Sequence, residues 1–409
     1  MTDEVGEQVL DDNRAQTLAL AIARTQAAPM VNVHTRYIHQ LEVEGWMNRA
    51  LEFLPNDKQL ADRQAAGGGL TTPEFAVLLA YTKNANIAEI GHVPGLAIDP
   101  YLKPEVLSYF PTPIRDRFAD RILEHPLRAE ITLTQIVNQM VNMSGISFDH
   151  RMTEETGAVI ADVLRAWVAA RDIFGLVEIW ERIEALGGQV PLATQLAMFM
   201  EARRMVERGV MWLLRHRRPP LALAETVTLF RPGVQELLAE LGPLIRGPLA
   251  EQTQALAVER VIAGVPAELA EPSAVWPLAH TTFDMVELAT IHECSVVVAT
   301  VAYWQVVEAL DVTWLWNAIG ALPRADRWQT HARAAVRDDL LSALADLTSD
   351  VLAHGGDAAA WAVSQSRAVD RATSIFSEIR RVGTYDLTTL SVALRQLRNL
   401  VLSTTAAPS

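Results

Sequence analysis

The amino-acid sequence predicts an all-α protein, a large multi-helix chain of packed antiparallel helices with no significant sheet. Apolar residues recur at spacings of three and four along nearly all of its 409 residues. The alternation of apolar and polar residues that is typical of a half-buried strand is almost absent. Proline and glycine divide the helical pattern into separate segments.

The N-terminal part of the chain predicts three helices in succession. Residues 2–28 form the first and residues 33–54 the second, and each of them ends before a proline. A flexible loop of three glycines, residues 67–69, comes next. Residues 71–74, Thr-Thr-Pro-Glu, then supply a hydroxyl cap, a proline suited to the first turn and an early acid, which together predict the start of a third helix.

The next part of the chain alternates irregular and helical segments. Residues 90–113 are rich in proline and are predicted to be irregular. A helix is expected over residues 126–144, with Gly145 as its left-handed cap. A second is expected from about residue 153 to residue 174, because acids favour a helix N-terminus. A third, long helix is expected over residues 191–215.

Two proline-containing segments, Pro219-Pro220 and Arg231-Pro232-Gly233, interrupt the pattern and indicate a soft domain boundary. The predicted organisation has a leading helix over residues 1–28, a first helical subdomain over 29–218 and a second over 219–409, with the boundary near 216–233. Beyond it, helices are expected over residues 234–245, 248–263, 283–310, 324–354, 357–381 and 387–402, followed by a frayed tail over 403–409.

Composition excludes several classes of function. The chain carries 49 acidic and 35 basic residues, a net charge of −14, which disfavours binding to a nucleic-acid backbone. Its one cysteine, Cys294, can form neither an internal disulfide nor a cysteine-rich zinc site. The acidic N-terminus lacks the order of a signal peptide, and the longest apolar stretch, residues 294–307, is too short to span a membrane. We therefore expect a cytoplasmic protein that binds no nucleic acid and no membrane.

The motifs of nucleotide and lysine chemistry have little support. The dinucleotide fingerprint G-x-G-x-x-G does not occur, and the glycines at 67–69 are followed by Leu70 rather than by the Lys-Ser or Lys-Thr of a phosphate loop. Lysine occurs only at Lys58, Lys83 and Lys103, so chemistry that needs a lysine has three candidates. We assign no cofactor-binding residue.

Metal ligation and nucleophilic catalysis have equally little support. His292-Glu293-Cys294 is the densest group of ligand types, but position 296 is valine and the second histidine of H-E-x-x-H is missing. His34 and His39 are five residues apart, a poor spacing for one helical face. The G-x-S-x-G elbow is absent, and Cys294 precedes an apolar run that predicts an inert, buried thiol. We assign no catalytic and no metal-binding residue.

Arginines gather on the helix that is expected over residues 191–215, and Arg204, Arg208 and Arg215 fall near one of its faces. This stripe suits an acidic partner or a phosphate. It suits equally a solvated face that pairs with Glu201 and Glu207. The negative net charge favours a solvated or intra-protein role over an external partner.

Two amides, Asn138 and Asn142, lie four residues apart on the otherwise apolar helix before Gly145. A buried amide needs hydrogen-bond partners. Our hypothesis is that these side chains bond to the turn at His150 and Arg151 and lock the two helices together.

Several segments occur in an order that resembles a known family. They are Asp3-Glu4-Val5 with residues 9–13 and 16–17, Gly69-Leu70-Thr71-Thr72-Pro73-Glu74 with residues 76–81, Tyr109-Phe110-Pro111, His125-Pro126-Leu127-Arg128, Val141-Asn142 before Gly145, Glu154-Glu155-Thr156-Gly157-Ala158, and Leu322-Pro323-Arg324 with Asp326-Arg327-Trp328-Gln329. Together they resemble the C-terminal region of the large, multidomain bacterial NAD-dependent glutamate dehydrogenases. The resemblance extends to about residue 352.

The resemblance implies a parent enzyme that converts L-glutamate and NAD to 2-oxoglutarate, ammonia and NADH in amino-acid catabolism. It implies that the catalytic module and the NAD site precede this region, so no catalytic or cofactor-binding residue carries over. The expected partners are the catalytic module of the same polypeptide and other copies of the parent, a homo-oligomer. On this view the chain is an excised or partial piece of that parent.

Three functions stay open for the chain itself. The leading hypothesis is a helical scaffold or interaction domain without an active site. The alternative is a regulatory module in which a pocket between helices senses a ligand, and the third is a self-contained enzyme with an unrecognised site. If the first holds, the leading helix should be loosely packed here, since its apolar face is made to be covered by the catalytic module.

Overall fold

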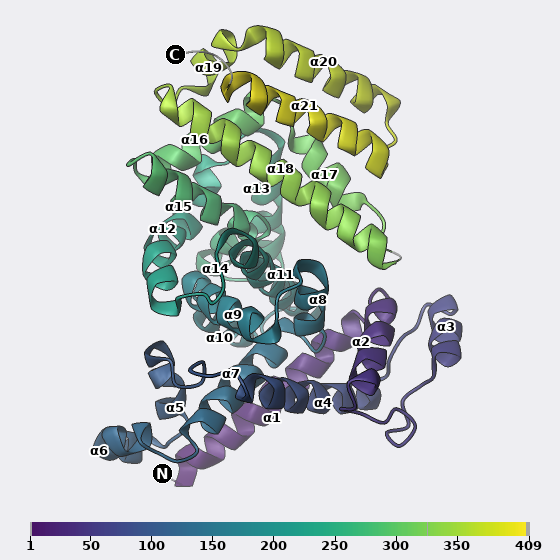
Figure 1. Ribbon diagram of the computed structural model, residues 1–409, viewed down its shortest axis with the longest axis vertical. Coiled ribbons are helices and arrows are strands. Elements are labelled where there is room, and N and C mark those ends of the chain that lie inside the picture. Colours follow the sequence, from purple (N-terminus) through teal and green to yellow (C-terminus); the bar gives the residue numbers. More distant parts are fainter. Residues whose placement is uncertain (1, 325, 406–409) are drawn as a thin grey trace. The chain divides into compact units, whose positions relative to one another are not determined.

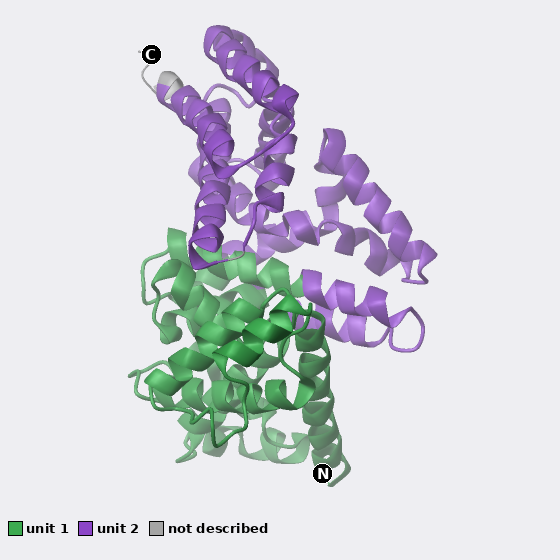
Figure 2. Ribbon diagram, turned by 90° about the vertical axis from the view of Figure 1, so that its right-hand side faces the viewer, with its two compact units in different colours: residues 1–172, 202–228 green, residues 173–201, 229–409 purple. Residues whose placement is uncertain are grey.

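The computed structural model describes residues 2–324 and 326–405, and across them it contains twenty-one α-helices, two short 3-10 helices and no strand (Figure 1). The predicted all-α class is confirmed. The chain divides into two compact units, unit 1 with residues 1–172 and 202–228 and unit 2 with residues 173–201 and 229–409 (Figure 2). The predicted domain limits stay predictions.

Three helices contain the points at which the chain passes from one unit to the other: α9 (Ile160–Phe174), α11 (Leu192–His216) and α12 (Leu223–Leu244). The helix predicted over 191–215 is thus confirmed as α11. Each unit is therefore built from segments that are distant in sequence.

Unit 1 has its centre where α4 packs against α7, and α1 lies against both (Figure 1). Leu78 of α4 and Ile136 and Met140 of α7 are fully buried. Besides its parts of α9, α11 and α12, the elements of this unit are α1 (Thr2–Thr25), α2 (Val31–Val43), α3 (Asp57–Ala65), α4 (Thr72–Gly91), η1 (Pro100–Leu102), α5 (Lys103–Ser108), α6 (Thr112–Leu123), α7 (Arg128–Ser144) and α8 (Phe148–Thr156).

Unit 2 is organised around α18, which packs against α16 and α21, while α20 and α21 form a helical hairpin. Trp304, Leu344 and Phe376 are fully buried. Its elements are α10 (Leu176–Glu184), α13 (Gly247–Ile262), α14 (Ala267–Ala274), η2 (Trp276–Thr281), α15 (Thr282–Ile291), α16 (Val296–Ala309), α17 (Thr313–Ala321), α18 (Arg327–Ala353), α19 (Ala358–Ser364), α20 (Ser366–Val382) and α21 (Leu387–Thr405).

Helix ends that depend on local chemistry match the predictions. α4 begins at the predicted capping box, in which the Thr71 N–H donates to Glu74 Oε2 at 2.7 Å. α7 ends before Gly145, but this glycine has φ 99° and ψ 159° rather than the left-handed helical values of the predicted cap. The physical reason is tertiary: Arg203 Nη2 donates to the Ser144 carbonyl at 2.5 Å, so a side chain of α11 satisfies this carbonyl of the last turn.

Four predicted helices are too long or misplaced, and one of them, predicted over 357–381, is the two helices α19 and α20. The helix predicted over 33–54 ends at Val43, where the chain reverses at Gly45 with φ 78°. The helix predicted over 153–174 is two helices, α8 and α9, separated by a left-handed residue at Gly157. The helix predicted over 283–310 breaks between α15 and α16, because Glu293 has φ 51° and Ser295 caps α16.

One helix break that the sequence predicts does not occur in the structure. Pro232 lies inside α12, where no break occurs. Its neighbour Gly233 has a Cβ position only 2.8 Å from Val286 Cγ2, so α15 packs directly on the backbone of α12. This packing stabilises a helix that has lost one hydrogen bond to the proline.

Residues 90–113, predicted to be irregular, contain η1 and α5 and reach the start of α6. Residues 403–405 of the predicted frayed tail are helical, and residues 406–409 lie outside the described residues. Among residues 2–324 and 326–405, no single helix is long and apolar enough to cross a membrane. Only the pair Trp276–Ile291 and Val296–Ala309, taken together across a bend of 118°, meets that length and composition.

Gly145 provides a test of the contact between α7 and α11. A Cβ at this position would lie 1.7 Å from Arg203 Nη2, so we expect Gly145→Ala to displace a buried guanidinium and to lower the free energy of unfolding by about 3 kcal/mol or more. Gly157→Ala is the matched control, because Gly157 also has a positive φ but a Cβ there meets nothing within 4 Å, and the expected loss is about 1 kcal/mol. Urea denaturation measures both, and equal losses would contradict the role given to Arg203.

Candidate functional site

A buried arginine, Arg203, and a half-buried one, Arg151, form the polar centre of unit 1. Arg203 of α11 donates to the Ser144 carbonyl, and the Ser144 hydroxyl in turn accepts from Trp167 Nε1 at 2.7 Å. One turn further along α11, Glu207 forms a two-point ion pair with Arg151 of α8. These contacts join α7, α8, α9 and α11 into one hydrogen-bonded group.

Burial governs the charges in this group. It lowers the pKa of Arg203 to about 10, and the nearby Arg151 acts in the same direction. Burial also acts to lower the pKa of Arg151, but Glu207 outweighs it and raises that pKa above its ordinary value. Both side chains are therefore positively charged at neutral pH.

These contacts agree with the intra-protein interpretation of the arginine cluster but correct the predicted partners of its two acids. Glu207 pairs with Arg151 of another helix, and Glu201 pairs with Arg260 of α13 within unit 2. Arg204 and Arg215 are exposed, as a solvated face requires. Spacing along one helix could not reveal the partners of the two acids, because those partners lie on other helices.

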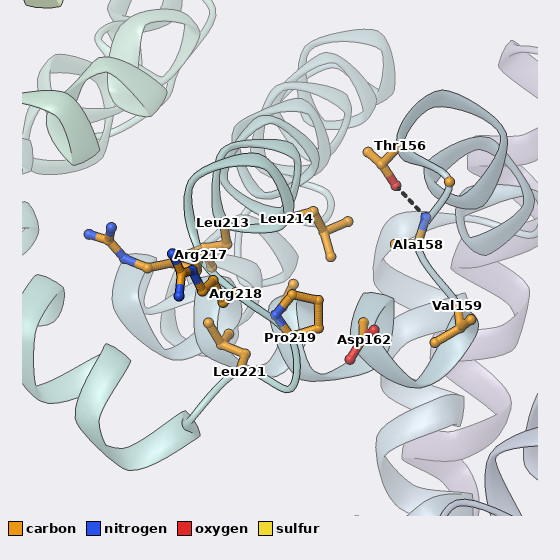
Figure 3. Close-up of a pocket in the computed structure, with 12 residues that line it drawn as sticks. Thr156, Ala158, Val159, Asp162, Leu213, Leu214, Arg217, Arg218, Pro219 and Leu221 are labelled. Atoms are coloured by element: carbon orange, nitrogen blue, oxygen red, sulfur yellow. Dashed lines mark hydrogen bonds between the residues drawn. The ribbon is translucent and has the colours of Figure 1, made fainter.

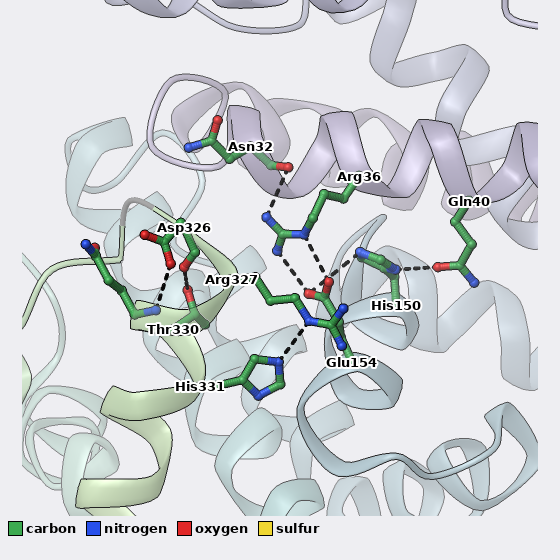
Figure 4. Close-up of polar contacts among 10 residues, drawn as sticks. Asn32, Arg36, Gln40, His150, Glu154, Asp326, Arg327, Thr330 and His331 are labelled. Atoms are coloured by element: carbon green, nitrogen blue, oxygen red, sulfur yellow. Dashed lines mark hydrogen bonds and ion pairs between the residues drawn. The ribbon is translucent and has the colours of Figure 1, made fainter.

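A second polar group links α8 to α2. The Tyr37 hydroxyl donates to Asp149 Oδ2 at 3.3 Å, and the Tyr37 ring stacks on His150 with 5.0 Å between ring centroids. His150 Nδ1 lies 2.5 Å from Gln40 Oε1 (Figure 4). Burial raises the pKa of Asp149 to about 6, although nearby donors, among them Asn86 and Tyr37, act against it.

Glu154 extends this group by one turn of α8. It accepts two hydrogen bonds from Arg36 of α2, each of 2.9 Å, in the geometry of a bidentate ion pair (Figure 4). His150 Nε2 lies 3.9 Å from Glu154 Oε2. The charge of Glu154 is therefore already balanced within the fold.

His34 and His39 separate as their spacing suggests. His34 is buried edge-on against Phe75, and burial, with Arg151 as the next cause, lowers its pKa to about 3. His39 is exposed. Within the described part of the chain, no three His, Cys, Asp or Glu side chains are placed to hold one metal ion.

The hypothesis for the two asparagines is wrong at Asn142. Its Oδ1 is buried and accepts no hydrogen bond from any described residue. His150 and Arg151 bond to Gln40 and Glu207 instead. The helices of this region are thus joined by α2 and α11, which the sequence places far from the turn.

The other sequence candidates are scattered. Lys83 on α4 is buried, and burial lowers its pKa to about 8 while Asp12 of α1 acts against the change, whereas Lys58 and Lys103 are exposed. Cys294 is half-buried rather than buried, and packs beside Leu288, Ala289 and Ala299. His292 Nε2 lies 2.8 Å from Ser349 Oγ.

Two cavities lie within unit 1, and residues 157–159 line both of them. The first, which we call the acidic cavity, has a volume of about 220 Å³. It is lined by residues of α2, α4, α8 and the start of α9: Tyr37, Gln40, Leu41, Glu44, Ala85, Asn86, Glu89, Asp149, His150, Thr153, Gly157, Ala158, Val159 and Ile160.

The second cavity, of about 270 Å³, lies beside Pro219 (Figure 3). Arg217, Arg218 and Asp162 line it together with apolar side chains such as Leu213 and Leu221. The Thr156 hydroxyl accepts from the Ala158 N–H at 3.2 Å and shapes the loop between the two cavities (Figure 3).

Sequence reasoning missed most polar side chains of the acidic cavity, among them Tyr37, Gln40, Asn86 and Asp149. A signal exists in part: Tyr37 and Gln40 are three residues apart and share one face of α2. That α4 and α8 complete the same cavity is a matter of tertiary packing.

The chain matches the family described as glutamate dehydrogenase, C-terminal, over residues 67–399. It is 35% identical over 407 residues to the NAD-specific glutamate dehydrogenase of Mycobacterium tuberculosis and 36% identical over 413 residues to that of Pseudomonas aeruginosa, and each match covers 98% of this chain and 25% of the relative. The NAD-specific glutamate dehydrogenase of Halomonas elongata is 35% identical over 358 residues, 87% of this chain and 22% of that protein. The chain thus spans about a quarter of the length of these relatives.

Asp149 gives a pH-dependent prediction. Because its folded-state pKa is about 6 against an ordinary value of 3.8, the folded protein holds this proton more tightly, and stability falls as pH rises from about 4 to about 7. Asp149→Asn removes this loss, because asparagine does not ionise. The free energy of unfolding of the variant minus that of the native chain should therefore increase by roughly 3 kcal/mol as pH rises from about 4 to about 7. Denaturant titrations at several pH values measure the difference, and a difference independent of pH would refute the assignment.

Proposed function

This chain belongs to the C-terminal family of glutamate dehydrogenases, and we propose that it is the helical scaffold and interaction region of an NAD-dependent glutamate dehydrogenase. In this proposal the whole protein oxidises L-glutamate to 2-oxoglutarate and ammonia and reduces NAD. The catalytic module and the NAD site then belong to the part of the relatives that this chain does not span. The chain contributes contacts rather than reacting groups.

The observation that carries the proposal is the exposed apolar face of α1. Val5, Val9 and Leu10 are 44%, 54% and 63% exposed, and the only fully buried residues of this 24-residue helix are Ala19 and Ile22 among its described positions. Val5 and Val9 are four residues apart and share one helix face, with Leu10 beside them, and exposed apolar side chains of this kind are typical of a contact site. This supports the packing of α1 against another part of the whole protein.

The connection between α2 and α3 supports the same role. Val43, Leu51 and Phe53 are exposed there, and Phe53 is 91% exposed with a backbone φ of 54°. A positive φ is costly for a residue with a bulky side chain. The chain thus holds an aromatic ring in solvent at a backbone cost, which a contact with the rest of the protein would offset.

The cavities of unit 1 favour a second candidate function, a regulatory module that senses a small ligand and biases the catalytic part. For the whole protein we infer a cytoplasmic homo-oligomer in amino-acid catabolism, on the basis of the family. The net charge of −14 supports partners other than nucleic acid.

The proposal predicts no turnover by the chain alone. We expect no NADH formation, measured by absorbance, when the 409-residue chain is mixed with L-glutamate and NAD, because the reacting groups belong to the catalytic module. The full-length enzyme in the same assay is the positive control. NADH formation by the chain would overturn the division of roles.

The scaffold role predicts a difference in hydrogen exchange along the chain. In a dilute, monomeric sample of the chain, the amides of the first half of α1 should exchange faster than those of the buried helix α16, because little apolar burial opposes the opening of α1. In the full-length protein the α1 amides should become protected, while α16 should change little. Equal and strong protection of both helices in the isolated chain would mean that α1 belongs wholly to this domain.

A further inference from the structure

Three carboxylates converge on the acidic cavity from three helices: Glu44 at the end of α2, Glu89 of α4 and Asp149 of α8. Among the described residues that line the cavity, none is a lysine or an arginine. His150 is the one basic side chain in the lining, and its Nδ1 faces the Gln40 amide oxygen. The lining therefore carries an excess of negative charge.

The inner part of the cavity has polar atoms without partners. Asp149 is 7% exposed, and its Oδ1 accepts no hydrogen bond from the residues that the structure describes. Asn86 is 4% exposed, and its Nδ2 lies near enough to Asp149 to lower the pKa of that carboxyl but forms no hydrogen bond of full geometry with the described residues. Buried polar groups are nearly always hydrogen-bonded, so this pair indicates a place where a polar ligand completes the structure.

The mouth of the cavity has two acids, Glu44 and Glu89, and neither forms an ion pair with a residue in the described part of the chain. Partial burial raises the pKa of Glu89, and the charge of Glu44 adds to this shift. Gln40 Nε2 donates to Glu44 Oε1 at 2.8 Å, a neutral contact that leaves the charge in place. Glu154, the next acid on α8, is already paired with Arg36 and adds nothing to the excess.

The other residues that line the cavity favour an organic cation over a metal ion. No three of the described acidic and histidine side chains are placed to hold one metal ion. Leu41, Ala85 and Ile160 supply apolar surface beside the carboxylates, and Tyr37 supplies an aromatic ring. A volume of about 220 Å³ suits a ligand smaller than a drug-sized molecule.

We propose that the acidic cavity binds a small alkylammonium ion, with one ammonium group at Asp149 and, in a diamine, a second at Glu44 and Glu89. The ammonium supplies a donor and a positive charge to Asp149 Oδ1, and the alkyl chain covers the apolar lining. This binding goes beyond both candidate functions, because it is a property of the cavity alone and holds whether or not α1 packs against another module.

Calorimetry on the full 409-residue chain tests whether binding depends on the positive charge of the ligand. It compares three probes with the same four-carbon chain. At pH 8, which lies above the pKa of about 6 of Asp149, this carboxyl is ionised, and both amino groups of 1,4-diaminobutane are protonated. We expect 1,4-diaminobutane to bind, butylamine to bind at least fivefold more weakly, and butane-1,4-diol not to bind. Binding of the diol as tight as that of the diamine, or no binding of either amine, would overturn the proposal.

Variants locate the site. Asp149→Asn should weaken both amines at least tenfold, since it removes the inner carboxylate charge. The double variant Glu44→Gln, Glu89→Gln changes exposed side chains only and should reduce the affinity for the diamine to that for butylamine. Glu240→Gln, an exposed carboxylate of unit 2, is the matched control and should change nothing.

Circular dichroism establishes that each variant keeps its helices. The two exposed changes at the mouth keep the test decisive even if Asp149→Asn disturbs the fold. Diamine affinity that is unaltered in the double variant would contradict the placement of the second ammonium group, and affinity that is unaltered in a folded Asp149→Asn chain would contradict the site itself.

Discussion

Unit 1 depends on two guanidinium groups that are largely removed from water, those of Arg151 and Arg203. A buried charge must be paired or fully hydrogen-bonded, because its removal from water is otherwise prohibitive. Arg151 meets this condition through Glu207, and Arg203 through the Ser144 carbonyl at the end of α7. The second contact is possible only because Gly145 lacks a side chain where Arg203 lies. One helix end, one glycine and two arginines therefore constrain one another.

The position of the acidic cavity follows from this constraint. Successive residues of a helix point about 100° apart, so a helix that directs Arg151 toward α11 directs Asp149 and His150 toward other neighbours. Those neighbours are Tyr37 and Gln40 of α2. The ion pair with Glu207 fixes the rotation of α8, and the same rotation brings Asp149 into the cavity wall. A side chain that makes no contact with the cavity thus determines which carboxylate lines it.

Features of the fold that depend on contacts within one helical turn were predictable from the sequence, whereas most features that depend on contacts between distant helices were not. The start of α4 was predictable because Thr71 and Glu74 satisfy each other within one turn, and Pro219-Pro220 separates α11 from α12 as expected. The helix break predicted at Pro232 does not occur, because the packing of Val286 on Gly233 keeps the helix intact. That contact joins residues about fifty positions apart in the sequence. Local signals were also missed: Ser295 is a good N-cap, but the long apolar run around it predicted one continuous helix. The acidic cavity could not be predicted from the sequence, because its acids come from three helices that only tertiary packing brings together.

The two kinds of surface in unit 1 differ in a way that bears on function. Inside, nearly every charge has a partner across helices, as in the pairs Arg36–Glu154 and Arg151–Glu207, and such pairs specify one arrangement of the helices. Outside, α1 and the α2–α3 connection leave valine, leucine and phenylalanine side chains in solvent. A region that works by contact needs both properties, because a rigid interior keeps an apolar exterior in a fixed shape and reduces the entropy lost on association. The acidic cavity is the exception to the first property, since the buried Asp149 forms no ion pair with a described residue and its Oδ1 accepts no hydrogen bond of full geometry. That exception is physically consistent with a ligand site, because an interior that pairs its charges elsewhere leaves them unpaired only where something else can supply the partner.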